Sequence, residues 1–173
     1  MKAINTNNWR KFRIGDLFDI KRPIARSQLE YDEGNVPFVA SGNYNNGIIK
    51  YCEPKENEKL DNGNCITVSP LDGSSFYQKV DFLGRGGAGS AIILLYNEKL
   101  NEYNGLYISS VIRHQLVKYS YNDQLSSTVI VDEYIKLPID SNQDIDWTYM
   151  ENYMKEIEKE CQNNLEVLKK IVG

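Results

Sequence analysis

The sequence has few of the side chains on which catalysis and metal binding usually depend. Its 173 residues include one histidine, His114, and three widely separated cysteines, Cys52, Cys65 and Cys161. A lone histidine is more often a surface or hydrogen-bonded residue than a catalyst or a ligand. An odd number of scattered cysteines suits neither a disulfide framework nor a zinc site. We therefore expect no metal site, and we interpret the cysteines as reduced, partly buried thiols.

Long hydrophobic runs are also absent. No stretch of about 18 apolar residues occurs, and residues 1–8 lack the apolar core of a secretory signal. Hydrophobic residues make up 41% and charged residues 25% of the chain, as in an ordinary globular protein that is long enough for one core. We expect a soluble, cytoplasmic protein with no contact to a membrane.

The sequence contains partial matches to enzyme motifs, but each match lacks a required part. Gly84 to Gly89 satisfy the G-x-G-x-x-G pattern of dinucleotide sites, but a short apolar run follows them instead of a helix. Glu53 and Lys55 have the E-x-K spacing of nucleases, without a second carboxylate on a preceding strand to help hold magnesium. No Pro-Pro pair occurs, so the Asn-Pro-Pro-Tyr-like loop of adenine methyltransferases is missing. We therefore predict that the chain is not an enzyme and holds no cofactor.

Negative charge slightly outweighs positive charge in the chain as a whole, but basic residues are concentrated at one end. The net charge is −4, yet residues 1–26 carry seven basic and two acidic side chains, so this segment is +5 and the remainder is −9. Such a segment can bind phosphates on an otherwise acidic protein, or it can be a solvated charged face.

The glycines at 84–89 favour a loop that lets the backbone approach another backbone, such as that of DNA, with Arg85 at its tip.

The longest predicted element is a C-terminal helix that begins after Asp146. Thr148 and Glu151 have the spacing of a capping box, and neither glycine nor proline follows until Gly173. Apolar residues recur at steps of three and four and form one nearly straight stripe. The stripe consists of Met150, Met154, Ile157, Cys161, Leu165, Leu168 and Val172. The helix would span roughly 37 Å, so either the stripe packs on its own domain or the helix overhangs and pairs with another helix.

Strands are predicted upstream of this helix. Val36–Ser41 and Ile48–Tyr51 flank Asn46-Gly47, which is a strong hairpin signal. Cys65–Ser69 and Tyr134–Ile139 are two further predicted strands. Residues 9–20 begin with strand-like alternation and continue as a short helical turn, whereas residues 101–115 fit either a helix or a strand.

Several short phrases resemble, in their order, the target-recognition domains of DNA-specificity (S) subunits in type I restriction-modification systems. They are WRKFRIGDLFDI at 9–20, PFVASGNYNNGI at 37–48, YSY at 119–121, YIKLPID at 134–140 and DWTYMENYM at 146–154. No single phrase is specific, and their order makes the resemblance, which covers Trp9 to about Lys159. It implies an α/β fold of the α+β type, in which a strand-rich, twisted-sheet globule precedes one long helix of the coiled-coil type.

The resemblance also implies a division of labour along the chain. We predict a DNA target-recognition domain over residues 1–146, and over residues 147–173 a helix for dimerisation and for docking a methyltransferase subunit. The chain would direct the enzyme complex to its target without being catalytic itself. The apolar stripe of the helix is the predicted dimer and subunit interface.

The candidate DNA-binding residues lie on basic and amide-bearing loops. Arginine and lysine suit phosphates, and asparagine or glutamine amides can pair with adenine in the major groove. The candidates are Lys21, Arg22, Arg26, Asn43, Asn45, Asn46, Ser74, Tyr77, Gln78, Arg85 and Arg113. For Asn46 the competing interpretation is that, with Gly47, it only makes the hairpin turn.

The partners follow from the same resemblance. They are double-stranded DNA, a methyltransferase (M) subunit that would bring S-adenosylmethionine, and a restriction (R) subunit bound through M. A full specificity subunit carries two recognition domains and two such helices, whereas this chain has one of each and is either a half-subunit that dimerises or a fragment. A homodimer would read a bipartite palindromic DNA site.

Two other functions remain open from the sequence. The chain has 12 tyrosines and many asparagines in its loops, which would also suit a carbohydrate- or protein-binding module. A free-standing nuclease would depend on magnesium and on Glu53. Salt distinguishes DNA from sugar, because DNA affinity falls steeply with ionic strength and sugar affinity hardly changes.

Overall fold

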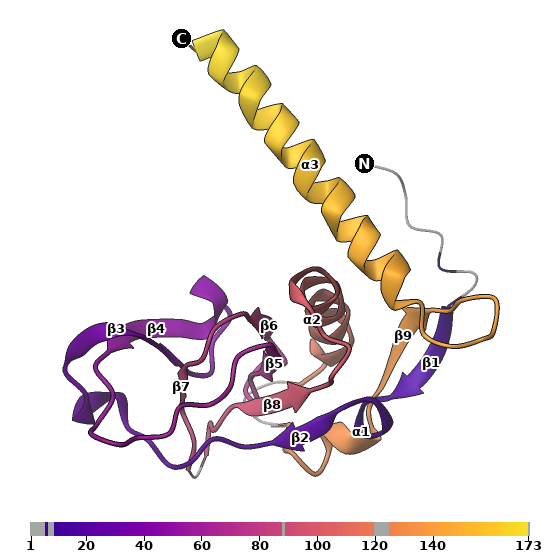
Figure 1. Cartoon of the computed structure of the whole chain (residues 1–173). Helices are drawn as coiled ribbons and strands as arrows, with labels where there is room; N and C mark the ends of the chain where they lie inside the picture. The colour runs from indigo at the N-terminus through magenta and orange to yellow at the C-terminus, as the bar shows by residue number, and fades with distance from the viewer. Residues whose placement is uncertain (1–5, 7–8, 88, 120–124, 173) are drawn as a thin grey trace.

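The computed structural model describes Thr6 and residues 9–87, 89–119 and 125–172. In chain order the elements are β1 (Trp9–Arg13), α1 (Ile14–Leu17), β2 (Asp19–Lys21), η1 (Gln28–Glu30), β3 (Glu33–Val39), η2 (Asn45–Gly47), β4 (Ile48–Cys52), β5 (Cys65–Val68), β6 (Ser75–Gln78), β7 (Leu83–Gly84), β8 (Ile93–Tyr96), α2 (Glu102–Leu116), η3 (Ile130–Asp132), β9 (Tyr134–Pro138) and α3 (Trp147–Val172). The mixture of sheet and helix with a long C-terminal helix confirms the predicted fold class (Figure 1).

The strands form three small sheets that follow one another across the molecule (Figure 1). A four-stranded antiparallel sheet in the order β2-β8-β5-β6 lies at the centre. On one side, β3 pairs antiparallel with β4, as the hairpin signal predicted, and parallel with β7. On the other side, β1 pairs antiparallel with β9, so that Trp9 faces Pro138 in the register. This ribbon brings the start of β1 close to the segment that leads into α3.

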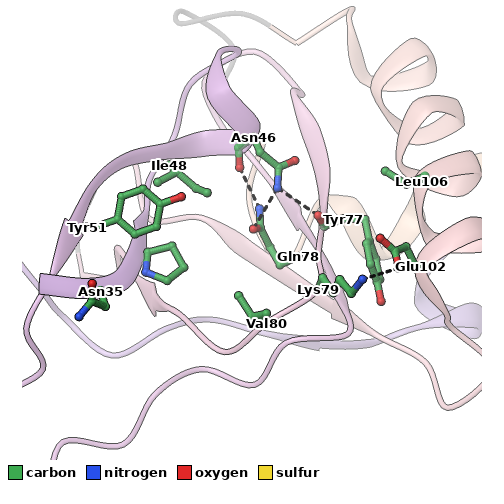
Figure 2. A pocket seen from close by; sticks show the side chains of 11 residues that line it. Asn35, Asn46, Ile48, Tyr51, Tyr77, Gln78, Lys79, Val80, Glu102 and Leu106 are labelled. Carbon is green, nitrogen blue, oxygen red and sulfur yellow. Dashed lines mark hydrogen bonds and ion pairs between the residues drawn. The ribbon is translucent and has the colours of Figure 1, made fainter. Parts of the chain in front are cut away.

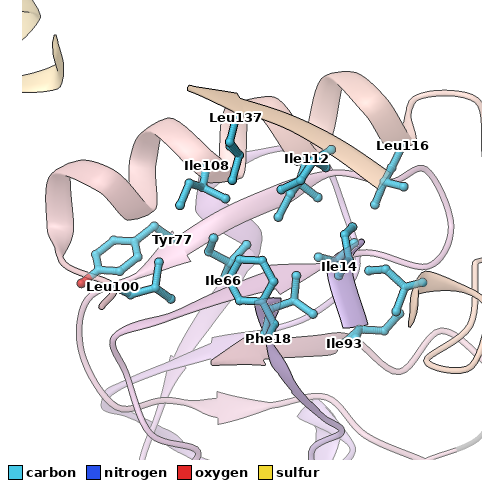
Figure 3. Packing of buried hydrophobic residues seen from close by; sticks show 14 of the residues in the cluster. Ile14, Phe18, Ile66, Tyr77, Ile93, Leu100, Ile108, Ile112, Leu116 and Leu137 are labelled. Atoms are coloured by element: carbon cyan, nitrogen blue, oxygen red, sulfur yellow. The ribbon is translucent and has the colours of Figure 1, made fainter. Parts of the chain in front are cut away.

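The main core lies between the central sheet and α2 (Figure 3). Ile108, Ile112 and Leu116 recur every four residues on α2 and are fully buried. They share the core with Ile66 of the sheet and with Ile14 of α1. Because one face of the helix covers one face of the sheet, burial of these side chains holds the two together.

The structure resolves the ambiguity at residues 101–115 in favour of a helix. The side chain of Asn101 accepts the backbone N–H groups of Tyr103 and Asn104, at 3.0 Å each, and Asn104 returns the contact to the N–H of Asn101 at 2.8 Å. This reciprocal capping box uses asparagine at both positions. It satisfies free N–H groups at the helix start, as the more usual serine and glutamate would.

The predicted capping box of α3 is wrong. The carboxylate of Asp146 accepts the N–H of Tyr149 at 2.8 Å, which makes Asp146 the cap. Glu151 instead accepts from the side-chain amide of Asn101 at 2.8 Å and pairs with Lys155 at 2.5 Å. Asp146 can cap because it directly precedes the first helical residue, Trp147.

The apolar stripe of α3 is buried only at its beginning. Met150 is fully buried in the main core, against which Trp147, Tyr153 and Met154 also pack. From residue 158 onward every described side chain of α3 is exposed, and the helix projects away from the sheets (Figure 1). The interpretation that the whole stripe packs on its own domain is therefore wrong. Met150 has to be removed from the predicted interface, because its side chain is already enclosed.

Two of the three cysteines are buried and the third is not. Cys52 and Cys65 lie inside the fold, while Cys161 is exposed on α3, so the prediction of partly buried thiols fails for Cys161. Burial raises the pKa of Cys65 to about 12, so this thiol stays protonated at neutral pH. No helix in the described part of the chain is long and apolar enough to cross a membrane.

Candidate nucleic-acid interface

The glycine-rich segment forms a tight connection instead of a dinucleotide site. The next element in the described part of the chain is a strand, β8. Arg85 continues the sheet, because its N–H donates to the carbonyl oxygen of Val39 at 2.8 Å and its carbonyl oxygen accepts from the N–H of Ile92 at 3.1 Å. A side chain at Gly86 would place its Cβ 2.0 Å from the carbonyl oxygen of Ile24. The prediction of close backbone approach is thus confirmed for Gly86, but the backbone approached is the chain's own segment 23–25.

Arg26 anchors this connection from inside the protein. Its side chain is 2% exposed and donates to Glu58 at 2.8 Å and to Asp61 at 2.6 Å. It also donates to the carbonyl oxygens of Gly84 at 3.1 Å and Lys59 at 2.7 Å. The predicted DNA contact of Arg26 is therefore wrong, because these four partners occupy the guanidinium and burial removes it from the surface.

The charges of this buried cluster stabilise one another. Burial would raise the pKa of Glu58, but hydrogen bonds from Arg26, from the Tyr31 hydroxyl at 2.7 Å and from the N–H of Lys55 outweigh it, so the pKa of Glu58 lies below its usual value. Burial, followed by the hydrogen bond to Glu58, raises the pKa of Tyr31 to about 12. Glu58 is therefore ionised at neutral pH and Tyr31 keeps its proton, so the cluster holds residues 26–31 firmly against residues 58–61.

Two other arginines of this region remain accessible. Arg22 is exposed and donates to the carbonyl oxygen of Gly87 at 3.1 Å. Arg85 is half-buried and its guanidinium contacts the hydroxyl of Ser90. The Ser41 hydroxyl donates to the carbonyl oxygen of Ser90 at 2.7 Å, which ties the glycine-rich segment to the loop before η2. Lys21 is also exposed, but Asp19 lies 2.8 Å away and balances its charge.

The hairpin tip is held in place by its own amides (Figure 2). Asn45 and Asn46 adopt positive φ angles of 47° and 56°, which asparagine tolerates better than most residues. The Asn46 amide donates to the carbonyl oxygen of Tyr77 and to the Gln78 side chain, both at 3.2 Å, and Gln78 donates back to the carbonyl oxygen of Asn46 at 2.9 Å. The side chains of Asn46 and Gln78 therefore stabilise the hairpin tip, while Asn43 and Asn45 stay exposed there.

Two further candidates are internal. Ser74 is buried and donates to Asp72 at 3.0 Å, within the turn before β6. Tyr77 is 7% exposed and donates its hydroxyl to Asn64 at 2.8 Å. The predicted DNA contacts of Ser74, Tyr77 and Gln78 are wrong for the protein as folded, because their polar atoms are used inside it.

Arg113 joins the hairpin tip from the side of α2. Its guanidinium lies 5.6 Å from the centre of the Phe76 ring, and a Cβ at Gly47 would lie 3.7 Å from the same ring. The accessible candidates are thus linked by contacts from Arg22 through the glycine-rich segment and the hairpin tip to Arg113. We call the accessible candidates, together with Ser41, the recognition surface: Lys21, Arg22, Ser41, Asn43, Asn45, Arg85 and Arg113.

Sequence reasoning missed two hollows beside the hairpin. One, of about 450 Å³, is lined by Asn46, Gln78, Ile48 and Tyr51 and is bordered by the ion pair of Lys79 with Glu102, 2.7 Å apart (Figure 2). The other lies next to Arg85 and includes the exposed side chain of Leu29. A single leucine in a polar loop forms no recognisable sequence pattern, so Leu29 could not be selected from the sequence.

Comparison with known proteins identifies the family. The model of the type I restriction modification DNA specificity domain matches residues 6–167, which is most of the chain. The chain belongs to this family. Among its relatives, the specificity subunit S.BcgI of a type II restriction enzyme from Heyndrickxia coagulans is 26% identical over 161 residues, covering 91% of this chain.

Solved specificity-subunit structures share the fold of this family member. The HsdS subunit from Thermoanaerobacter tengcongensis has a TM-score of 0.55 at 18% identity, over 98% of this chain and 41% of that one. A chain solved in work on complex assembly and conformational transition of the type I R-M system has a TM-score of 0.60 at 19% identity, over 98% and 43%. This chain likewise spans 46% of the length of S.BcgI, so it corresponds to less than half of each relative.

Proposed function

We propose that this chain is a non-catalytic specificity component that recognises a DNA sequence and directs a type I restriction-modification methyltransferase to it. Membership of the DNA specificity domain family carries this proposal. The recognition surface supports it, because Arg22, Arg85 and Arg113 form no ion pair with any described carboxylate and remain able to bind phosphates or guanine. Family membership does not favour the carbohydrate-binding alternative.

In this proposal the catalytic chemistry belongs to a partner. An M subunit would bring S-adenosylmethionine and take the target adenine out of the duplex, since a base inside the stack cannot reach an active site. An R subunit would join through M. The overhanging part of α3 would dock the M subunit, because its side chains are exposed and it projects from the sheets.

The same helix would also pair two copies of the chain. Leu165 and Leu168 of the stripe are 57% and 55% exposed, and Ile171 beside the stripe is 74% exposed, although the stripe begins with the buried Met150. A row of exposed apolar side chains at helical spacing favours a partner helix. Two copies related by a twofold axis would present two identical recognition surfaces, which predicts a bipartite palindromic site.

Co-expression with the M subunit from the same genome tests the proposal. Methylated adenines would be mapped in the host DNA by long-read sequencing. A new bipartite palindromic motif is the expected result, and an asymmetric bipartite motif would mean that a second, different recognition domain is recruited. Copurification of the two subunits without any methylated motif would contradict the DNA-reading role.

Variants of the recognition surface then test whether the proposed residues bind the DNA motif. Arg85→Ala and Arg113→Ala should weaken binding of the purified complex to its motif, and each should reduce the salt slope of the affinity by about one. Lys99→Ala removes one exposed positive charge outside the recognition surface and serves as the matched control. Wild-type affinity and salt slope in Arg85→Ala would remove Arg85 from the interface.

A further inference from the structure

Two apolar side chains stand exposed beside the arginines of the recognition surface. Leu29 of η1 is 89% exposed and Ile49 of β4 is 45% exposed. They border a hollow of about 640 Å³ that is also lined by Ala40, Ser41 and Arg85. Three separate segments therefore meet there, namely η1, the β3–β4 hairpin and the glycine-rich segment. We call this the Leu29 hollow.

The backbone that carries Leu29 is held on both sides. The buried cluster fixes Arg26 before it and Tyr31 after it, through Glu58. The N–H of Glu30 also donates to the carbonyl oxygen of Ser27 at 3.0 Å, which closes the turn that contains Leu29. The backbone of Leu29 is thus held at a fixed position, and a preorganised backbone loses less conformational entropy on binding than a loose loop does.

The charge around the hollow favours an anionic occupant. Arg26 and Arg85 are the ionisable residues among the described side chains that line it. Arg26 is balanced by Glu58 and Asp61, whereas the guanidinium of Arg85 hydrogen-bonds with the hydroxyl of Ser90 and forms no ion pair with a described carboxylate. An uncompensated guanidinium beside exposed leucine and isoleucine fits a ligand that carries both negative charge and an apolar group.

The major groove of DNA offers this combination. Thymine presents its 5-methyl group there beside hydrogen-bond acceptors and next to the phosphate backbone. We propose that Leu29, supported by Ile49, contacts the methyl group of one thymine in the recognised sequence, while Arg85 binds the adjacent backbone or a neighbouring guanine. This inference rests on the proposed function and adds specificity-determining residues to it.

Replacing thymine by uracil tests the contact, because the exchange removes only the methyl group. Every motif with a methylated adenine contains thymine in the opposite strand. Duplexes with uracil at one thymine at a time would be titrated with the complex of this chain and its M subunit. One position should weaken binding by roughly fourfold, the value for burying one methylene-sized group.

A double-mutant cycle assigns the effect to Leu29. With Leu29→Ala the uracil penalty should disappear at that position and persist unchanged with Leu106→Ala. Leu106 is a suitable control because it is also a partly exposed leucine, at 39%, but lies on α2 outside the Leu29 hollow. Circular dichroism would verify that both variants keep the wild-type melting temperature.

The outcomes separate this inference from the proposed function. If the complex binds its motif but no uracil position weakens binding, or if the penalty survives in Leu29→Ala, the thymine contact is wrong and DNA recognition stands. If the complex binds no duplex at all, the proposed function fails and this inference fails with it.

Discussion

Arg22 and Arg26 lie four positions apart in the same basic segment, yet the fold gives them opposite roles. Arg22 is exposed and touches one carbonyl oxygen. Arg26 is buried with two carboxylates and two carbonyl oxygens around its guanidinium. Positive charge alone therefore does not identify a DNA contact. Residues 58–61 and 84 supply the partners that occupy Arg26, whereas Arg22 has no carboxylate partner among the described residues and can bind a ligand.

Replacing each arginine by methionine should separate these roles. Arg26→Met leaves Glu58 and Asp61 without their main partner, and removing one member of a buried ion pair costs about 3–5 kcal/mol of unfolding free energy. Arg22→Met changes an exposed side chain and should alter stability by less than about 0.5 kcal/mol. Urea unfolding of the two variants measures the difference, and equal stabilities would contradict the structural role of Arg26.

Among the elements, α2 shows how tertiary packing can require a residue that is unfavourable in a helix. Gly105 lies in its interior, where glycine is unfavourable. A Cβ at this position would lie 2.3 Å from Cδ2 of Tyr77, whose hydroxyl is fixed by Asn64. The glycine therefore permits the close contact between α2 and β6, and β6 in turn supports the hairpin tip through Gln78.

Gly105→Ala is expected to destabilise the protein by about 1–3 kcal/mol, the usual range for overpacking. Helix propensity alone predicts the opposite sign, since alanine is favoured over glycine by about 1 kcal/mol. Ser110→Ala, on the exposed face of the same helix, gains propensity without a clash and should leave stability unchanged or slightly higher. Thermal unfolding compares the two, and a more stable Gly105→Ala would show that Tyr77 can move away.

For the molecule as a whole, the important feature is that α3 is buried in the core at its beginning and exposed to solvent over the rest of its length. Its first turns complete the main core through Met150, and its remaining turns lie beyond the sheets. Leu165, Leu168 and Ile171 in the distant half are mostly exposed, so these apolar side chains are available to another helix. Assembly would therefore involve residues that contribute little to the fold of one copy.

Leu165→Lys should accordingly weaken self-association without changing the fold of the single chain. A lysine at this position places charge in the proposed helix interface, whereas the monomer loses only a side chain that is already 57% exposed. Asn163→Lys adds the same charge on the opposite face of α3 and is the matched control. Sedimentation equilibrium measures the dimer constant, and identical constants for both variants would place the interface elsewhere.

Local sequence chemistry determined several features of this protein. Asn46-Gly47 marked the hairpin, because asparagine and glycine tolerate the positive φ angles of the turn. The spacing of apolar residues after Asp146 predicted the long helix, and the alternation and turn at 9–20 predicted β1 and α1. The order of these phrases also identified the family, whose model matches residues 6–167.

The tertiary structure decided which side chains are free to act. Arg26 and Glu58 are 32 positions apart, as are Asn46 and Gln78, and each pair is joined by hydrogen bonds that only the folded chain creates. The same holds for Met150, which the core encloses, and for Leu29, which a buried cluster presents to solvent. Local patterns fix turns and helices because those depend on neighbouring residues, whereas burial and partnership depend on contacts between segments distant in the sequence.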